Sequence, residues 1–525
     1  MRQRFIAAIL VALGAWWAGT SRPAAAQDLA IGLGRAVTSI DPHFHNTGPN
    51  NSVAAHIYDR LIHHDARQRP VPGLAVSWSA LDELTWEFRL RPGVRFHDGS
   101  AFGADDVVAT FARAPNVPNS PSSFALYTRA IAAVEKVDDL TVRLRTREPH
   151  PLLPNDVSAI NIVARGAARA TTAEFDSGAA AIGTGPYRVA AWRKDEQLVL
   201  ERNAQWWGGA TPWARVAQRI IVNDAARVAA LLAGDVQAIE VVPTADVRKL
   251  EGDPRVALAR EVSNRLLFLN LDQARDVTPF VADRDGRPLA RNPFKDVRVR
   301  RAISKAINRA AIADRLQEGL AIPAGGVIPD GFYGSDPTLA PEPFDLDGAR
   351  RLLAEAGHPD GFSLTLHGPN DRYPNDEKVT PGIAQMLARL GLATKVELLP
   401  WSVYAARASR QEFSATFFGW GAATGEASSP LRSLMATVDA ARGLGASNRG
   451  RYSNPAFDAA LTAALRTIDD GRRELLLREA TRIGIADVGI VPLYYQVNVW
   501  ALRRGLDYEG RADDQTHAWL IRPQR

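Results

Sequence analysis

Several short stretches of the chain alternate apolar and polar residues, a pattern typical of half-buried β-strands. In residues 84–90 (LTWEFRL), every second side chain is apolar. Residues 187–191 and 198–201 show a similar alternation on either side of a polar turn at 193–196, which predicts a β-hairpin. The sequence GTGP at 183–186 comes directly before this hairpin. Because glycine tolerates positive φ and proline fixes φ, we expect a well-defined turn there.

Other stretches repeat apolar residues at helical spacing. Asp296 is a good N-cap, and the apolar positions from Val299 to Ala310 mark one helical stripe. Ser52 is expected to cap a short helix over 52–62. Further helices are predicted at 224–234, 345–357 and 377–391, and strands at 236–242, 266–271, 363–367, 395–399 and 413–420. Because strands alternate with helices, the chain is predicted to be of the α/β class.

Length and composition limit the class of protein. A chain of 525 residues exceeds the roughly 250–300 residues at which a single core usually divides, so two or three lobes are expected. Hydrophobic residues make up 46% and charged residues 23%, which is ordinary for a globular protein and excludes a disordered or collagen-like chain.

Residues 1–26 have the organisation of a secretory signal peptide. Arg2 and Arg4 form the basic start, an apolar run over 5–17 follows, and three alanines at 24–26 supply the cleavage site, so the mature chain is expected to begin at Gln27. The run is too short to span a bilayer comfortably, and a retained membrane anchor is the alternative. The chain contains no cysteine, so neither a lipid anchor nor a disulfide is expected. We therefore predict a soluble protein of the periplasm of a Gram-negative cell.

The net charge changes when the signal peptide is removed. The formal charge is +5, and Arg2, Arg4 and Arg22 contribute three of these charges, which leaves +2 for the rest of the chain. A nearly neutral chain with dispersed basic residues does not indicate nucleic-acid binding. A lone arginine in this arginine-rich sequence is interpreted as a solvated surface residue.

Five of the ten histidines lie within 22 positions, namely His43, His45, His56, His63 and His64. Imidazole is a common metal ligand, so this cluster suggests a metal site. However, no carboxylate or cysteine pattern completes a recognisable spacing. The histidines are interpreted as loop and helix-surface residues, and neither a metal nor a cofactor is predicted.

Motifs of hydrolytic enzymes do not occur in the sequence. There is no Gly-x-Ser-x-Gly elbow, no His-Glu-x-x-His and no cysteine nucleophile. Asp105 and Asp106 are adjacent acids, but they lie at a predicted helix start, where the helix dipole favours them. The protein is therefore not predicted to be an enzyme, and a secreted hydrolase is only a remote alternative.

Three blocks of sequence resemble one family. They are GTGPYRVAAWRKDEQLVLERNAQWWGG at 183–209, the stretch from SW to DDVV within 73–111, and NPFKDVRVRRAISKAINR at 292–309. In this order and at these positions they are similar to the bacterial extracellular solute-binding proteins of the dipeptide, oligopeptide and nickel type, known as family 5. The resemblance extends over nearly all of the chain after the signal peptide.

The resemblance implies a type II periplasmic binding protein with two main α/β lobes joined by a hinge and an extra smaller domain. It also implies a monomer that binds a small peptide or peptide-like ligand and docks on an ABC permease complex in the inner membrane. The expected division is a signal peptide at 1–26, lobe I at 27–58, 183–265 and 488–525, domain II at 59–182, and lobe III at 266–487.

The resemblance also indicates ligand-binding residues. It places the loop of Thr47 and Gly48 at the cleft and an aromatic residue near Tyr127 against the ligand. Arg372 lies near the position of the arginine that holds the ligand carboxylate in dipeptide-binding members. The segment 420–430 (WGAATGEASSP) is a glycine-rich strand end, where open α/β sheets bind ligands. Its residues Trp420 and Gly421, together with Trp401 and Tyr404, are the candidate walls.

One position departs from the family pattern. Peptide-binding members have an aspartate three residues after the tryptophan of this segment, and it pairs with the α-amino group of the peptide. Here that position is Ala423, and Glu426 lies three residues further on and is the candidate replacement. The predicted function is thus capture of a peptide or peptide-like solute in the interlobe cleft for an ABC importer. A nickel or metal-chelate, opine or sugar-conjugate ligand is the alternative.

Overall fold

The computed structural model describes residues 28–524, so the predicted signal peptide and its cleavage site lie outside the described residues. One large mixed sheet runs through the molecule in the order β13-β15-β17-β12-β18-β11-β1-β10-β9-β8, with β14 beside β18 and β16 beside β15. These strands are β1 (Asp28–Leu33), β8 (Tyr187–Arg193), β9 (Gln197–Arg202), β10 (Arg215–Ile220), β11 (Ala238–Ile239), β12 (Val256–Leu271), β13 (Val281–Ala282), β14 (Ala321–Pro323), β15 (Ser363–Pro369), β16 (Ala393–Leu399), β17 (Ala415–Gly421) and β18 (Val491–Arg503).

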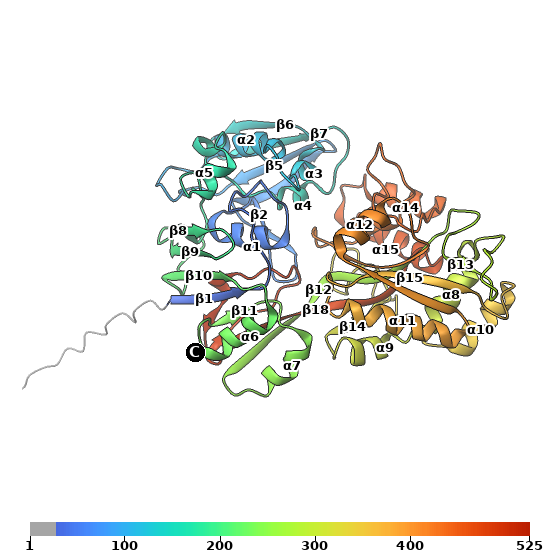
Figure 1. The fold of residues 1–525 in the computed structure, drawn as a ribbon. Coiled ribbons are helices and arrows are strands. Elements are labelled where there is room, and N and C mark those ends of the chain that lie inside the picture. The colour runs from blue at the N-terminus through green and yellow to red at the C-terminus, as the bar shows by residue number, and fades with distance from the viewer. Residues whose placement is uncertain (1–27, 525) are drawn as a thin grey trace, which may run out of the picture.

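Two long antiparallel strands, β12 and β18, join the two halves of the molecule (Figure 1). Their pairing is irregular between Val262 and Leu266, where three residues of β12 lie opposite one residue of β18. On one side of this irregularity β18 pairs with β11 of lobe I, and on the other side β12 pairs with β17 of lobe III. β12 therefore crosses the predicted boundary between residues 265 and 266, whereas β18 lies wholly within the range predicted for lobe I and yet also pairs with β14 of lobe III.

Lobe I contains β1 and β8 to β11, and lobe III contains β13 to β17. The helices of lobe I are α1 (Gly48–Ile57), α6 (Asp224–Ala233) and α7 (Thr244–Glu251). Those of lobe III are α8 (Val297–Ala306), α9 (Arg309–Ala311), α10 (Leu346–Glu355), α11 (Asp376–Leu390), α12 (Trp401–Ser409), α13 (Ser428–Pro430), α14 (Pro455–Ala464) and α15 (Asp470–Ala486). Each half has its own buried cores: Trp213 and Tyr187 lie in one of lobe I, and Phe294 and Leu366 in one of lobe III.

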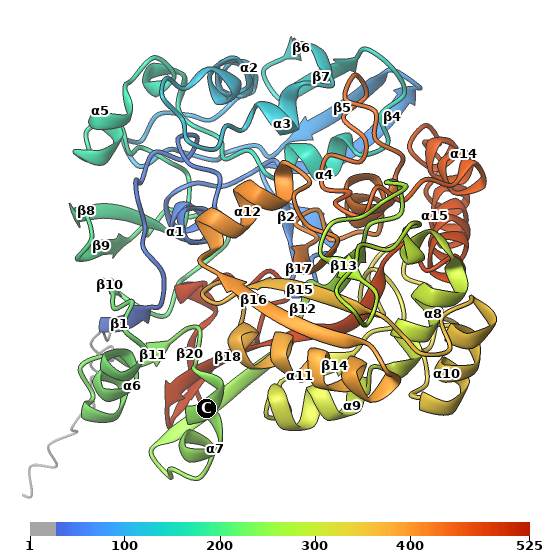
Figure 2. The same cartoon turned by 45° about the vertical axis from the view of Figure 1, so that its right-hand side comes forward.

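Domain II packs beside lobe I, at the top left of Figure 1. Its four-stranded antiparallel sheet has the order β4-β5-β7-β6 and encloses a core around Phe88 and Phe124. Its elements are β2 (Ile62–His64), β3 (Pro70–Pro72), β4 (Ala75–Asp82), β5 (Thr85–Leu90), β6 (Ile131–Asp138), β7 (Thr141–Thr146), α2 (Ala104–Arg113), α3 (Ala125–Thr128), α4 (Leu153–Val157) and α5 (Thr172–Asp176). Near the C-terminus β19 (Leu506–Asp507) pairs with β20 (Arg522–Pro523). The rotated view in Figure 2 places α12 of lobe III in front of domain II and α1.

The turn at 183–186 lies where the chain returns from domain II to lobe I. The backbone N–H of Gly185 donates to the carbonyl of Ile57, 3.0 Å away, so the outgoing and returning segments lie side by side. A Cβ on Gly183 would approach that carbonyl to 1.9 Å, which explains why a glycine stands there. Thr184 donates to the Asp59 carboxylate over 2.9 Å and holds the same junction.

The sequence predicted many of these elements correctly and two helices incorrectly. The strand at 84–90, the hairpin after residue 186 and a helix ended by Gly234 in the left-handed conformation are confirmed. The helix predicted from Ser52 begins instead at Gly48, with Pro49 in its first turn. The stripe from Val299 to Ala310 is not one helix, because α8 ends at Ala306 and Asn308 caps a new turn by accepting a hydrogen bond from the Ala311 N–H.

No helix within residues 28–524 combines the length and the apolar character that crossing a bilayer requires.

Candidate functional site

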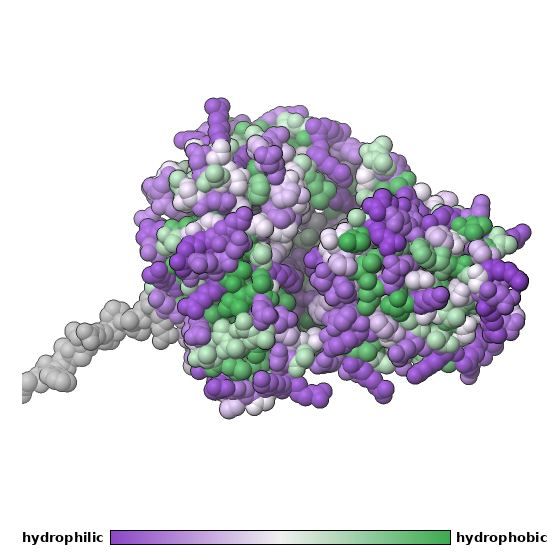
Figure 3. Space-filling view, viewed as in Figure 1, coloured by the Kyte–Doolittle hydropathy of each residue, from purple (hydrophilic) through white to green (hydrophobic). Residues whose placement is uncertain are grey.

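A cleft of about 1260 Å³ lies between the two halves of the molecule. Figure 3 shows the surface hollowed at this place, between lobe I with domain II on one side and lobe III on the other. Lobe I contributes the segment from Gly34 to Asn51, the residues around Val241 and the C-terminal stretch at 513–515. Lobe III contributes 371–377 and the end of β17.

The structure brings together eight of the ten predicted ligand-binding residues. These line the cleft: Thr47, Gly48, Tyr127, Arg372, Trp401, Trp420, Gly421 and Ala423. Tyr404 and Glu426 do not line it.

Tyr404 and Glu426 lie outside the cleft because other groups already hold them. Tyr404 is fully buried, and its hydroxyl donates to the carbonyls of Phe417 and His367 over 2.8 and 3.2 Å. Glu426 is buried in an ion pair with Arg473. The expectation that Glu426 replaces the aspartate missing at Ala423 is therefore at odds with the geometry, whereas Ala423 itself is exposed and faces the cleft.

Residues of lobe I and domain II form one wall. Thr47 precedes α1, and its hydroxyl donates to Asn50 over 3.1 Å. The Tyr127 hydroxyl accepts a hydrogen bond from the Asn46 side chain, 3.3 Å away. Burial raises the pKa of Tyr127, so this hydroxyl stays protonated and is free to donate to an acceptor on a solute.

An aromatic pair forms the opposite wall. Trp401 begins α12 and Phe418 lies on β17, and their ring centroids are 6.0 Å apart in an edge-to-face arrangement. The guanidinium carbon of Arg372 lies 5.1 Å from the Trp401 centroid, which is within the range of a cation–π interaction. Arg372 has no carboxylate within ion-pair distance among residues 28–524, so its charge is available to a solute.

Two further arginines share one carboxylate in the cleft. Arg35 donates to Asp514 over 2.9 Å, and Arg265 lies 3.8 Å from the same carboxylate. The charge of Asp514 raises the pKa of Arg35, whereas burial lowers the pKa of Arg265. Arg35 and Arg265 thus share one carboxylate at ion-pair distance, and Glu240 is a second acid whose charge acts on Arg35.

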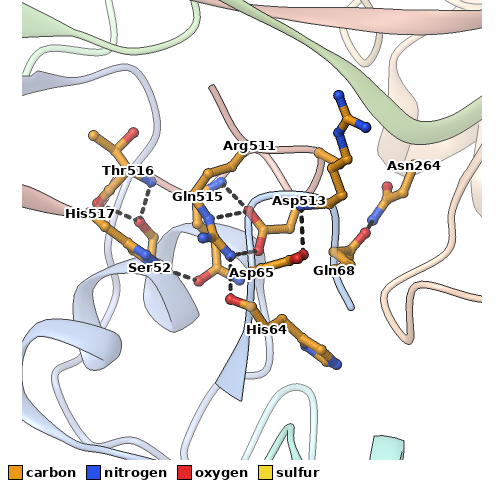
Figure 4. A network of polar contacts seen from close by, with 12 residues as sticks. Ser52, His64, Asp65, Gln68, Asn264, Arg511, Asp513, Gln515, Thr516 and His517 are labelled. Carbon is orange, nitrogen blue, oxygen red and sulfur yellow. Dashed lines mark hydrogen bonds and ion pairs between the residues drawn. The ribbon is translucent and has the colours of Figure 1, made fainter. Parts of the chain in front are cut away.

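The C-terminal stretch that carries Asp514 is fixed by a network of polar contacts (Figure 4). Arg511 donates to Asp513 over 2.6 Å and to the carbonyl of His64 over 3.4 Å. The Thr516 N–H donates to the Ser52 hydroxyl over 3.0 Å, which ties the stretch to α1. These bonds position the cleft residues 513–515 in advance, so a solute meets a rigid wall.

Direct hydrogen bonds join the two sides of the cleft. Gln68, between β2 and β3 of domain II, donates from Nε2 to the carbonyl of Ala423 over 3.1 Å and accepts from the Asn264 amide over 2.6 Å. Asn155 donates to the carbonyl of Thr424 over 3.2 Å. We call residues 422–426 the latch loop. A Cβ on Gly425, at φ +68°, would come within 2.8 Å of Gln68, so this contact requires glycine. The two sides of the cleft are thus in direct contact at the latch loop.

No sequence pattern pointed to Arg35, Arg265 or Gln68. An isolated arginine in an arginine-rich chain was expected to be solvated, and a glutamine in a turn carries no motif. Their importance depends on segments that are distant in the chain and meet only at the cleft.

The clustered histidines do not converge on one point. His43 contacts the carbonyl of Asn161 over 2.8 Å, and His56 contacts that of Ser52 over 2.9 Å. Within residues 28–524, no three histidine, aspartate or glutamate side chains lie close enough together to hold a metal ion.

Comparison with known proteins decides the family. The sequence pattern of the bacterial extracellular solute-binding proteins, family 5 Middle, matches residues 69–441. The glutathione-binding protein GsiB of Pectobacterium atrosepticum is 32% identical over 481 residues, which are 90% of this chain and 89% of that protein. The chain belongs to the family 5 solute-binding proteins.

A further relative and two solved structures are also similar to this solute-binding protein. GsiB of Salmonella typhi is 30% identical over 513 residues, or 95% of this chain and 94% of that protein. The structure of HbpA2 from Haemophilus parasuis superposes with a TM-score of 0.82 at 24% identity, over 95% of this chain and 100% of that one. The structure of DppA from Helicobacter pylori, in complex with the peptide STSA, superposes with a TM-score of 0.74 at 25% identity, over 95% of this chain and 98% of that one.

These likenesses confirm the predicted type II periplasmic binding fold with two α/β lobes and an added domain. Proteins of this family are periplasmic solute-binding components of ABC importers rather than enzymes. The cleft between the lobes is accordingly the candidate site for the solute of this solute-binding protein.

Proposed function

We propose that the protein captures an acidic, peptide-like solute in the interlobe cleft and delivers it to an ABC permease complex in the inner membrane. The observation that carries this proposal is that, among the described residues, three guanidinium groups in the cleft have only one carboxylate between them at ion-pair distance. Arg35 and Arg265 share Asp514, and Arg372 lies on Trp401 with no carboxylate partner in the described part of the chain. A solute carboxylate would complete a charge-assisted hydrogen bond there, and such bonds are the strong ones.

The identity of residue 423 supports the same ligand class. An alanine faces the cleft at the position where the resemblance to peptide-binding members implies an aspartate for the α-amino group. The nearest acid along the latch loop, Glu426, already neutralises Arg473. Recognition of a solute would therefore depend on its carboxylates more than on a free α-amino group.

Glutathione is the first solute to test. The relatives from Pectobacterium and Salmonella are named as glutathione-binding proteins. Glutathione is a small peptide with two carboxylates and a γ-linked glutamate, so its chemistry fits a cleft with arginines that lack carboxylate partners and without an acid at 423.

Export of the chain and removal of its signal peptide are also proposed. Residues 1–26 would direct export and be removed, and without a cysteine the mature chain would be a freely soluble monomer. Thr47, Gly48 and Tyr127 on one side of the cleft and Trp420 and Gly421 on the other would close over the solute, and Gln68 would hold the latch loop in the closed form.

Isothermal titration of the mature protein, Gln27 to Arg525, tests the proposal. We expect saturable binding of one glutathione without turnover. Arg372→Gln should weaken it at least tenfold, because a hydrogen bond to a charged group contributes about 1.5–3 kcal/mol. Arg291→Gln, at an exposed position outside the cleft, is the matched control and should bind normally. A neutral sugar, a metal chelate or an opine that binds with an affinity unaffected by Arg372→Gln would contradict the proposal.

A further inference from the structure

The cleft contains a fourth guanidinium group, that of Arg449. Arg449 lines the cleft from lobe III, and its guanidinium carbon lies 5.4 Å from the centroid of Phe418. Phe418 is the partner of Trp401 in the aromatic pair, and the Arg372 guanidinium lies over the Trp401 ring. An arginine therefore contacts each ring of the pair.

Arg449 lacks the partners that a half-buried guanidinium normally has. Among residues 28–524, no carboxylate lies within ion-pair distance, and the buried Nε has no hydrogen-bond partner. Nη1 reaches only the carbonyl of Ala446, at 3.5 Å. The charged and titratable groups that act on Arg449 are Tyr404, Tyr373 and Arg451, and burial lowers its pKa. Burying a cation without a counterion costs free energy, so the site is short of one anion.

The loop that carries Arg449 is held rigidly. Asn448 donates to the carbonyls of Ala436 and Tyr452 over 2.9 and 2.8 Å, and it accepts from the Tyr452 N–H over 3.0 Å. On the other side of Arg449, the carbonyl of Gly450 accepts from the Gln273 N–H over 2.8 Å. The backbone on both sides of Arg449 is therefore fixed, so the half-buried guanidinium extends from a defined point of the cleft wall.

We propose that Arg449 binds a second carboxylate of the solute, so that the protein selects dianionic solutes with one carboxylate at Arg372 and the other at Arg449. The backbone between the two carboxylates would cross the Trp401–Phe418 pair. An extended chain of three residues spans about 10 Å, which is the scale of two rings whose centroids are 6.0 Å apart with a cation on each. This inference rests on the proposed function and goes further, because it assigns the second anionic end and its residue.

The experiment combines variants with ligands that each lack one carboxylate. Titrations with glutathione, its glycine monoester and its glutamyl α-monoester are made on the parent protein, Arg449→Gln and Arg372→Gln. We expect Arg449→Gln to bind glutathione at least tenfold more weakly and to be insensitive to esterification of one of the two carboxylates. Arg372→Gln should be insensitive to esterification of the other.

Arg451→Gln is the matched control, because Arg451 is exposed two residues further on and does not line the cleft. Its affinities should equal those of the parent. The melting temperature of ligand-free Arg449→Gln distinguishes binding from a structural role. It should be unchanged or higher, since an unpaired buried charge has been removed, and only the ligand-induced rise should be lost.

The outcomes separate this inference from the proposed function. Glutathione bound equally well by the parent and Arg449→Gln would overturn the role of Arg449 and leave the acidic solute in place. If Arg449→Gln weakened the binding of glutathione and of both esters by the same factor, the role of Arg449 would also be overturned. If glutathione does not bind, the same proteins are tested with unbranched dicarboxylates from succinate to suberate. If a dicarboxylate stabilises the parent but not Arg449→Gln, the inference is supported. If no dicarboxylate stabilises the parent, both the inference and the proposed function are contradicted.

Discussion

Glu426 and Arg473 form a buried ion pair in which a carboxylate oxygen lies 2.5 Å from Nη2 of the guanidinium. Glu426 ends the latch loop, and Arg473 lies on α15 with its guanidinium carbon 4.9 Å from the Tyr333 centroid. Ser428 also donates to Glu426. The carboxylate that the sequence offered for ligand binding thus anchors the latch loop to lobe III, and it faces a second cavity of about 790 Å³ on the far side of the loop.

The first prediction concerns this pair. Glu426→Gln leaves Arg473 as an uncompensated buried charge, so the free energy of unfolding should fall by about 3–5 kcal/mol. Solute affinity at a temperature where the variant is folded should change by less than about twofold. Urea unfolding and titration measure the two quantities. Glu474→Gln, which breaks the half-exposed pair with Arg478, should cost less than about 1 kcal/mol. Intact stability with lost affinity would place Glu426 at the solute instead.

The second prediction concerns the exposed alanine of the latch loop. Ala423→Asp places a carboxylate in the cleft. This substitution should weaken the binding of an acidic solute roughly tenfold, because like charges repel more strongly near a protein surface than in bulk water. Ala423→Asn has nearly the same shape without the charge and should bind within about twofold of the parent. Competition titrations compare the two. Equal affinities for the aspartate and asparagine variants would mean that no solute anion lies near residue 423.

The third prediction concerns closure. Gln68→Ala removes the hydrogen bonds to Asn264 and to the Ala423 carbonyl, and each contributes about 0.5–1.5 kcal/mol. Since these bonds join the two sides of the cleft, their loss should destabilise the closed form and weaken solute binding about tenfold.

Small-angle scattering with and without solute checks this expectation, because the ligand-free variant should have a larger radius of gyration than the ligand-free parent. Gln205→Ala, at an exposed position outside the cleft, is the control. A variant with unchanged radius and affinity would show that the latch contacts contribute nothing to closure.

The fourth prediction concerns acid stability. Burial lowers the pKa of His43 and of His56 to about 4, and that of His64 to about 3. At His56 the reason is visible in the geometry, since Nε2 accepts a hydrogen bond from the Ala518 N–H over 3.0 Å and cannot also carry a proton.

The unfolded chain takes up protons on these histidines below about pH 6.5, whereas the folded protein does not. Stability is therefore fully present above that pH and falls as the pH drops toward 4. At pH 5 the loss should be about 2 kcal/mol for each histidine with a folded pKa near 4. Urea unfolding at pH 7, 6 and 5 measures it, and His56→Gln should flatten the dependence. A constant free energy of unfolding from pH 7 to 5 would contradict the assignment of neutral buried histidines.

Local patterns predicted the elements whose form depends on nearby residues. The alternation at 84–90 became β5, and Gly234 ended α6, because burial on one face and a left-handed cap are local properties. The break at Ile307 was not predictable, since Arg309 turns inward to the carbonyls of Ser304 and Pro492, and the latter is distant in the chain.

The residues of the candidate site likewise include some that could be predicted from the sequence and others that could not. Arg372 was found through resemblance to a family, and Trp401 and Trp420 through their place near a glycine-rich strand end; all three line the cleft. Glu426 was chosen by spacing along the chain, but its partner Arg473 comes from a helix that the spacing does not include. Arg449 resembled every other arginine in the sequence, and only the structure reveals that it lacks a counterion within the described residues.

The irregular step between Val262 and Leu266 in the β12–β18 pair has a mechanical consequence. Asn264 and Arg265 lie within this step, where Asn264 bonds to Gln68 and to the Ala422 carbonyl and Arg265 faces the cleft. Since β12 and β18 are the strands that join the lobes, we expect a rotation of one lobe against the other to turn near these residues. A solute bound at Arg265 would then lie beside the turning point, where the lobes move least, so this contact should persist in an open and a closed cleft alike.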